Sequence, residues 1–366
     1  MIRSGGTSNQ TVLLLLVLAT ITFVAGRAVR RTVDNSDRSR TEDYITQYEI
    51  NTERYRVTTD DGYQLIVYRL LPQVPAQGAV LIQHGIRQSS AGWLNLEKNL
   101  PMQLLEAGME VWLGNSRASP ESAGHLTFSN DSSQFWDFSF HEIGFYDLAA
   151  MIDAALEISQ RKQLHLIAYS EGASAALTLL SERPEYNAKI TSVNLLAPAA
   201  FMANSQFKLV ALLFNKFRFI LPMSVDQILI NSNQLSKNSR KQLEHYQQLI
   251  LSGQFRRFDH GPRRNMERYG SRDPPNYDLS KITRPVVLHY GGRDSTVHPK
   301  DVEHLSTQLP KETGVQLIEY DLLDHGDFTS RTEAASNVYP MVVEDIVAKS
   351  KQIEEVTVAK EALMSE

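Results

Sequence analysis

Short apolar runs, separated by stretches with helical periodicity, occupy most of the chain from residue 79 onward. The runs lie at 79–85, 111–116, 164–170, 192–198, 285–292 and 315–320. Runs that are apolar on both faces and separated by helices indicate a parallel sheet covered on both sides. The helix between the second and third runs is the clearest. Its apolar residues recur at helical spacing: Phe145, Leu148, Ala149, Ile152, Ala155 and Leu156.

The segment ahead of the first run has a different pattern. Residues 29–46 are mostly polar and charged, which predicts a loosely ordered lead-in. Residues 55–70 alternate between apolar and polar, with a turn signal at Asp60, Asp61 and Gly62. This alternation predicts two strands joined in a hairpin.

The regular order of runs and helices stops between Pro198 and Pro285. We interpret residues 199–284 as a helical cap inserted between two halves of an α/β core, 47–198 and 285–352. Within the cap, residues 207–221 place their apolar side chains on one helical face. Residues 353–366 are expected to form a charged tail after a terminal helix.

An uncharged apolar segment runs from Val12 to Ala25, after Arg3. It is shorter than the roughly 20 residues that span a bilayer, and small residues follow it. Residues 1–28 are therefore predicted to be a cleaved signal peptide, which implies a protein that is secreted or held in the lysosomal or endomembrane lumen. The alternative is a retained signal anchor in the membrane. Asn130, in N-D-S, is then a candidate glycosylation site.

Composition excludes several classes of chemistry. The 366 residues are 42% hydrophobic and 22% charged, as in an ordinary globular protein. The formal net charge is −5 and there is no basic block, which argues against nucleic-acid binding. The chain has no cysteine, so thiol catalysis, disulfides and cysteine-bound zinc are excluded. We expect neither a cofactor nor a metal site.

Three chemistry-bearing residues fall where the predicted strands end. Ser170 ends the 164–170 run, Asp294 follows the 285–292 run, and His325 follows the last run. Ligands of doubly wound sheets gather at the carboxyl ends of the strands. A serine nucleophile needs a base, and the base needs an acid to hold its tautomer. The order Ser, Asp, His is that of α/β-hydrolases, so the sequence predicts this fold and this triad.

The chain also resembles the acid lipases, the family typified by gastric lipase and lysosomal acid lipase, from about residue 48 to 346. The motifs that carry the resemblance are Q-H-G-I-R-Q-S-S, V-W-L-G-N-S-R, F-W-D-F-S-F, L-L-A-P-A-A, S-G-Q-F-R-R-F-D-H-G, P-P-N-Y-D-L, Y-G-G-R-D and P-K-D-V. The resemblance implies hydrolysis of acylglycerols and steryl esters, with transient contact with lipid surfaces. It also implies that Ser170 is the nucleophile, Asp294 the acid and His325 the base. The backbone N–H groups of Ile86 and Glu171 are the implied oxyanion donors.

Three residues near the predicted site depart from the family pattern. Ala168 replaces the usual glycine, and we expect its single extra methyl group to be accommodated. Glu171 replaces the usual glutamine, and Arg87 replaces an apolar residue. An unpaired carboxylate beside a developing oxyanion would oppose it electrostatically. We therefore expect Arg87 to pair with Glu171; the alternative is that Arg87 points into solvent.

The predicted cap is short, because only 124 positions separate Ser170 from Asp294. The missing part falls where the family's lid usually lies, so the sequence leaves open whether a lid gates the site. The predicted helix at 207–221 is either a reduced lid that touches acyl chains or a buried part of the cap. The leading interpretation is a secreted serine ester hydrolase that acts on neutral lipid esters or smaller esters. The alternative is a non-catalytic lipid carrier on the same fold. A peptidase would need an acidic anchor in the cap for a substrate amine.

Overall fold

The computed structural model describes residues 30–31, 39–122, 124–209, 211–212 and 239–364. The predicted signal peptide and most of the predicted 207–221 helix lie outside the described residues. No helix in the described ranges is both long and apolar enough to cross a membrane.

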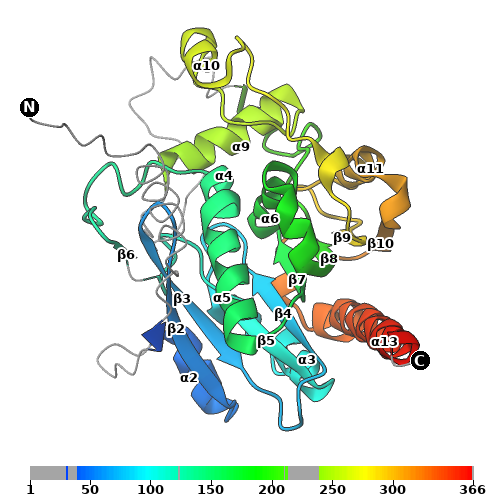
Figure 1. Ribbon diagram of the computed structural model, residues 1–366. Coiled ribbons are helices and arrows are strands. Elements are labelled where there is room, and N and C mark those ends of the chain that lie inside the picture. Colours follow the sequence, from blue (N-terminus) through cyan, green and yellow to red (C-terminus); the bar gives the residue numbers. More distant parts are fainter. Residues whose placement is uncertain (1–29, 32–38, 123, 210, 213–238, 365–366) are drawn as a thin grey trace, which may run out of the picture.

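A ten-stranded sheet runs through the molecule in the order β1-β2-β3-β5-β4-β7-β8-β9-β10, and β6 pairs with β3 (Figure 1). Neighbouring strands from β5 to β10 along this path are parallel. The pairs β1–β2, β2–β3 and β3–β5 are antiparallel. All six apolar runs and the hairpin are confirmed as strands. Their bounds are β1 (Arg30–Arg31), β2 (Thr52–Thr58), β3 (Tyr63–Leu70), β4 (Gly78–Gln83), β5 (Met109–Gly114), β6 (Gly124–His125), β7 (Leu164–Tyr169), β8 (Ile190–Leu196), β9 (Val286–Gly291) and β10 (Gln316–Tyr320).

Helices cover both faces of the sheet, as predicted. Along β7, Leu166 and Ala168 belong to a core cluster with α5 (Ala149–Ser159) and α6 (Glu171–Glu182). Ile167 and Tyr169 belong to a second cluster with α3 (Leu100–Glu106) and α13 (Tyr339–Met364). Figure 1 shows these two pairs of helices on opposite sides of the strands. The α-helices of the core are α2 (Arg40–Gln47), α3 (Leu100–Glu106), α4 (Phe140–Glu142), α5 (Ala149–Ser159), α6 (Glu171–Glu182), α11 (Pro299–Gln308), α12 (Asp327–Ser330) and α13 (Tyr339–Met364).

Shorter helical segments join these elements. Among the described residues, 3-10 turns form η2 (Ser90–Trp93), η4 (Pro184–Lys189) and η6 (Lys311–Thr313) in the core and η5 (Leu279–Lys281) in the cap. The segments η3 (Ile143–Leu148), between α4 and α5, and η7 (Ala334–Val338), before α13, are π-helical. The predicted helix after the second apolar run is therefore α4, η3 and α5 in succession. Five of its six periodic apolar residues are buried, and Phe145 is half-buried.

The two chain-terminal predictions need correction. The lead-in predicted to be loose contains α2, whose N-terminus is closed by a capping box between Ser39 and Glu42. Thr41 fixes α2 on the core, since its buried hydroxyl donates to Glu121 at 2.7 Å. At the other end, α13 continues to Met364, so the charged residues after 352 prolong the terminal helix. In α2 the capping box and the Thr41 contact offset a polar composition.

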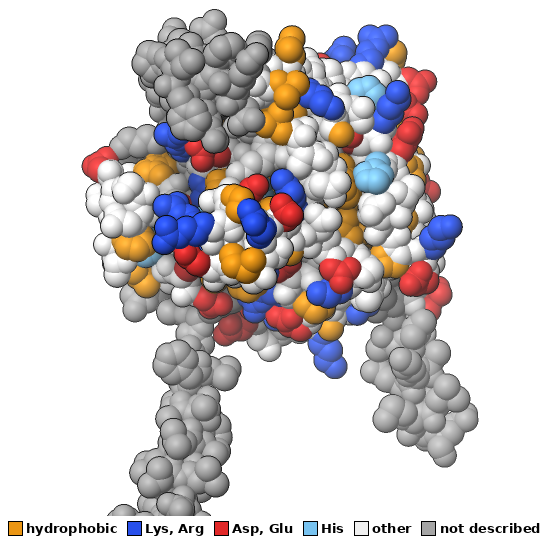
Figure 2. Space-filling model, turned by 90° about the horizontal axis from the view of Figure 1, so that it is seen from above, with side chains coloured by type: hydrophobic (Ala, Val, Ile, Leu, Met, Phe, Trp, Pro, Cys, Tyr) orange, Lys and Arg blue, Asp and Glu red, His pale blue; other side chains and the backbone are white. Residues whose placement is uncertain are grey.

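The cap lies between β8 and β9 in sequence and over the carboxyl ends of the strands (Figure 1). It contains the helices α9 (Arg240–Ser252) and α10 (Pro262–Tyr269). Seen from this side, charged side chains of both signs are mixed, with small apolar groups between them (Figure 2). The predicted insertion before the acid-bearing strand is confirmed.

Candidate active site

Ser170 occupies the sharp turn between β7 and α6. Its backbone has φ 52° and ψ −112°, in the left-handed region that a residue with a Cβ rarely adopts. The turn is possible because α6 packs directly on the end of β4. A Cβ on Gly172 would lie 2.7 Å from the His84 carbonyl oxygen and 2.8 Å from that of Gln83. Only glycine permits this approach, which raises Ser170 above the sheet edge.

The structure brings Ser170, Asp294 and His325 into one hydrogen-bonded chain. The Ser170 Oγ lies 2.9 Å from Nε2 of His325, and Nδ1 of His325 lies 2.8 Å from Oδ2 of Asp294. The other carboxylate oxygen of Asp294 accepts the backbone N–H groups of Thr296 and Val297, at 2.9 and 2.8 Å. The acid is thus held in one orientation, with Oδ2 directed at the imidazole.

The loops that carry the acid and the histidine are packed against each other. A Cβ on Gly291 would lie 2.2 Å from the carbonyl oxygen of Leu323, so the end of β9 touches the loop after β10. The Tyr169 hydroxyl donates to the carbonyl oxygen of His325 at 2.9 Å. The residue before the nucleophile therefore helps to fix the backbone of the histidine.

The loop after β4 lies against the nucleophile, where the sequence places the oxyanion hole. A Cβ on Gly85 would lie 3.2 Å from the Cβ of Ser170, and Ile86 follows it. His84 secures the loop, because its Nδ1 bonds to Gly85 O and its Nε2 accepts the N–H of Ser116. Burial lowers the pKa of His84 to about 4, so this ring stays neutral in mildly acidic solution.

The amide of Glu171 is the second predicted donor. Glu171 is the first residue of α6, and the first N–H groups of a helix have no acceptor within the helix. This amide therefore stands at the same end of the sheet as Ile86 and adjoins the nucleophile.

The side chain of Glu171 has a partner that the sequence does not predict. Its carboxyl group is buried and accepts the side-chain amide of Gln242, at 2.6 and 2.7 Å to the two oxygens. Arg87 has an exposed side chain. The observed partner of Glu171 is therefore Gln242, because α9 lies over the turn and covers the carboxyl group, and the Arg87–Glu171 pair stays a prediction.

Gln242 is the site residue that sequence reasoning missed. It lies three residues after Ser239, whose side chain caps α9. The S-x-x-Q spacing is a signal for a helix start. That signal gives the start of α9, but it does not give the core residue that α9 faces. Arg87, Glu171 and Gln242 all line one narrow cavity of about 20 Å³ beside the turn.

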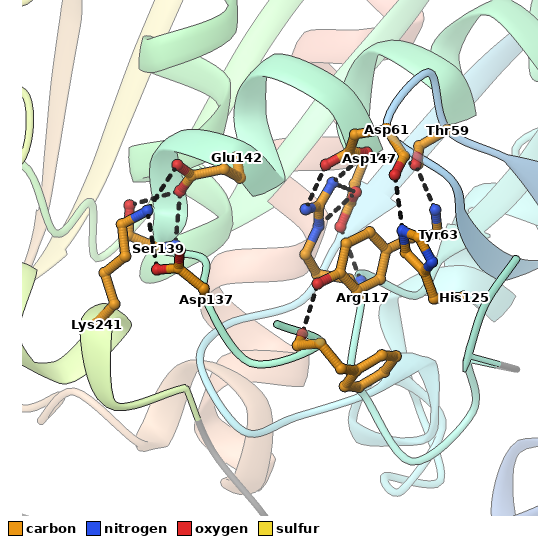
Figure 3. A network of polar contacts seen from close by, with 11 residues as sticks. Thr59, Asp61, Tyr63, Arg117, His125, Asp137, Ser139, Glu142, Asp147 and Lys241 are labelled. Carbon is orange, nitrogen blue, oxygen red and sulfur yellow. Dashed lines mark hydrogen bonds and ion pairs between the residues drawn. The ribbon is translucent and has the colours of Figure 1, made fainter. Parts of the chain in front are cut away.

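A buried ion-pair network supports the loop below the site (Figure 3). Arg117 binds Asp147 through Nε and Nη2, at 2.9 and 2.7 Å, and Asp61 through Nη1 and Nη2, at 2.8 and 2.9 Å. Its guanidinium also lies 3.9 Å from the ring centre of Tyr63. The hairpin turn, the loop after β5 and η3 are thereby joined at one side chain.

The second group in Figure 3 attaches the cap to the core. Lys241 of α9 lies 3.1 Å from Glu142 and 3.5 Å from Asp137. Burial alone would raise the pKa of Glu142, but Lys241 and His141 lower it to about 2. Adjacent residues of α9, 241 and 242, thus contact α4 and α6 respectively.

Two further predictions have different outcomes. Ala168 is fully buried within β7, so its extra methyl group is accommodated as expected. Asn130 is exposed on the loop after β6, and its glycosylation stays a prediction. Among the residues that the structure describes, no group of three or more His, Asp or Glu side chains is placed to hold a metal ion.

Comparison with known proteins gives consistent matches. Residues 41–97 match the family model "partial alpha/beta-hydrolase lipase region", and residues 78–328 match "alpha/beta hydrolase fold". Lipase 1 of Drosophila melanogaster is 32% identical, over 86% of this chain and 81% of the relative. Gastric triacylglycerol lipase of Rattus norvegicus is 31% identical, over 81% of this chain and 88% of the relative. An esterase structure from Pyrococcus furiosus, 17% identical, covers 88% of this chain and 98% of its own, with a TM-score of 0.52.

Proposed function

The chain belongs to the acid lipase family of α/β-hydrolases, and we propose that it cleaves carboxylic esters of neutral lipids through an acyl-enzyme on Ser170. Carboxylic ester hydrolysis is the activity of the family. The finer assignment to acylglycerols draws support from relatives named as triacylglycerol lipases, and steryl esters are the alternative substrate class that we propose. The observation that carries the proposal is the hydrogen-bonded chain from Ser170 through His325 to Asp294.

In the acylation step, His325 Nε2 takes the proton of Ser170 as its Oγ attacks the ester carbonyl. Asp294 accepts a hydrogen bond from the Nδ1–H group of His325. This bond holds the tautomer in which Nε2 carries no proton, and it stabilises the imidazolium that forms. The carbon–oxygen bond to the alcohol then breaks, and His325 returns the proton to the leaving alkoxide. The products of this step are the free alcohol and an acyl ester on Ser170.

Deacylation repeats these steps with water. His325 takes a proton from the water molecule, and the resulting hydroxide attacks the acyl ester. The bond to Ser170 Oγ breaks, the proton returns to the serine, and the carboxylic acid leaves. In both steps the carbonyl oxygen carries negative charge, which the N–H groups of Ile86 and Glu171 stabilise.

We assign the protein to an extracellular or endomembrane-lumenal setting, on the pattern of its first 28 residues. Its substrate would be a lipid or a small ester, with transient contact at lipid surfaces. This setting also gives Asn130 the opportunity to be glycosylated. Secretion of the full-length chain from expressing cells, with N-terminal sequencing of the product, tests the assignment.

Activity-based labelling tests the proposed nucleophile. The folded protein should react with a fluorophosphonate probe at Ser170, and Ser170→Ala should abolish the label without lowering the thermal midpoint. His325→Ala should slow labelling at least a hundredfold. Hydrolysis is then measured on esters of increasing chain length, with and without emulsion. A folded sample that neither labels nor hydrolyses any ester would favour a lipid carrier instead.

A further inference from the structure

The side chain of Glu171 is a buried acid directly beside the proposed nucleophile. Its exposed fraction is 3%, and its own N–H is one of the two proposed oxyanion donors. The cycle described above does not use the carboxyl group. Its position requires an explanation, because an uncompensated negative charge in a dry site would oppose the negative charge that develops on the substrate.

The carboxyl group connects the cap to the core of the enzyme. Gln242 of α9 donates to both of its oxygens, and the hydroxyl of Tyr246, one turn further along α9, also interacts with it. That hydroxyl lies 2.9 Å from Ser174 Oγ, and Ser174 donates to the Ala199 carbonyl at 2.6 Å. One polar network therefore links α9, the start of α6 and the segment after β8.

The surroundings of Glu171 favour its protonated form. Burial, with the carboxylate of Asp147 as a smaller contribution, raises the pKa of Glu171 to about 8, although Gln242 and Tyr246 oppose the shift. Two cations line the same cavity: Arg117 is bound to Asp147 and Asp61, and Arg87 is exposed. His84 also lines this cavity and is neutral, because burial lowers its pKa to about 4. Outside the cavity, burial raises the pKa of the Tyr246 hydroxyl that contacts Glu171, so this hydroxyl stays protonated.

We propose that Glu171 works as a neutral carboxylic acid, a positioning residue that couples cap helix α9 to the oxyanion hole through Gln242. A protonated carboxyl group has the shape of a glutamine amide, with one donor and one acceptor oxygen. It holds the first turn of α6, and hence the amide of residue 171, in place beneath α9. When Glu171 ionises, its charge stands beside the oxyanion and slows acylation. The inference rests on the proposed function.

The pH dependence of kcat on a soluble short-chain ester tests the proposal. In the wild type kcat should fall about tenfold per pH unit above about 8, while KM changes little. Glu171→Gln should lose this alkaline decline, so the ratio of its kcat at alkaline pH to its kcat at neutral pH should exceed the wild-type ratio. Glu182→Gln, at the far end of the same helix, is the matched control and should retain it. Gln242→Leu should move the decline to higher pH, because the amide N–H favours the ionised form.

The possible results separate this inference from the proposed function. Fluorophosphonate labelling and circular dichroism are followed across the same pH range for each variant. If wild type and Glu171→Gln label, turn over substrate and share one alkaline decline, Glu171 has no such role, although the nucleophile assignment stands. If no variant labels at any pH while all stay folded, the proposed function itself fails. Loss of the decline in Glu171→Gln alone supports the inference.

Discussion

Gly172 packs so closely on His84 that a Cβ at residue 172 would lie 2.7 Å from the His84 carbonyl oxygen. This contact joins the first turn of α6 to the loop after β4. The two proposed oxyanion donors, Ile86 and Glu171, lie on the two sides of the contact. Their spacing is therefore set by backbone packing, which no side-chain rearrangement can relieve.

Gly172→Ala should separate the two donors and reduce catalysis. A shift of the order of 1 Å costs about a hundredfold in rate, and we expect kcat/KM to fall by about that factor. Overpacking should also lower the free energy of unfolding by about 1–3 kcal/mol. Gly92→Ala is the control, since a Cβ there meets no atom within 4 Å. Equal activity of Gly172→Ala and Gly92→Ala would mean that the contact does not set the donor spacing.

Asp294→Asn should trap the wrong tautomer of the histidine. The amides of Thr296 and Val297 hold one carboxylate oxygen, so the oxygen of an asparagine would remain there and its NH2 group would face His325. Nδ1 must then accept, which leaves the proton on Nε2, toward Ser170. We expect kcat to fall about 10⁴-fold with an unchanged thermal midpoint, measured by ester hydrolysis and calorimetry. A loss below tenfold would contradict this assignment of the acid.

The parts of this fold that could be predicted from sequence are those set by burial and chain order. Buried parallel strands are apolar on both faces, so the runs at 79–85 and 164–170 were recognisable without their neighbours. The sites of Ser170, Asp294 and His325 followed, because parallel strands bring their carboxyl ends to one edge. Helix α2 could also have been found, since Ser39 and Glu42 have capping-box spacing.

The parts that could not be predicted depend on packing between distant segments. Glu171 and Arg87 were expected to pair because the loops that carry them converge. The observed partner, Gln242, comes from a cap helix that begins 69 positions after Glu171. The capping residue Ser239 makes the N-terminus of α9 predictable from the sequence. The position of α9 over α6, however, depends on the contacts of Lys241 and Gln242 with the core. Such tertiary contacts produce no periodic pattern of residues along the sequence.

Arg117→Met should destabilise the protein by leaving Asp147 buried without its cation. Removing one partner of a buried ion pair costs about 3–5 kcal/mol, which urea unfolding measures. The double variant Arg117→Met/Asp147→Leu should recover part of this loss, since it removes the isolated charge as well. The control is Arg263→Met, at an exposed i, i+4 pair with Glu267, and should cost under about 0.5 kcal/mol. Additive single effects in the double variant would argue against coupling.

The raised pKa of Glu171 also predicts how folding stability depends on pH. The carboxyl group has an ordinary pKa of 4.5 and one of about 8 in the folded protein. Between these values the folded chain holds a proton that the unfolded chain has lost. The free energy of unfolding therefore falls as pH rises through this window. Below about 4.5 both states are protonated, so the full stability is present there.

Glu171→Gln removes this titration and should be more stable than the wild type at alkaline pH. The difference in the free energy of unfolding should be smallest near pH 4.5, grow as pH rises and level off above about 8. Its upper value is about 5 kcal/mol, since one pKa unit corresponds to about 1.4 kcal/mol. Urea unfolding at intervals of one pH unit measures the difference, and titrations of other groups cancel between the two proteins. Glu182→Gln should show no such growth, and parallel curves for Glu171→Gln and the wild type would show that Glu171 ionises normally in the folded protein.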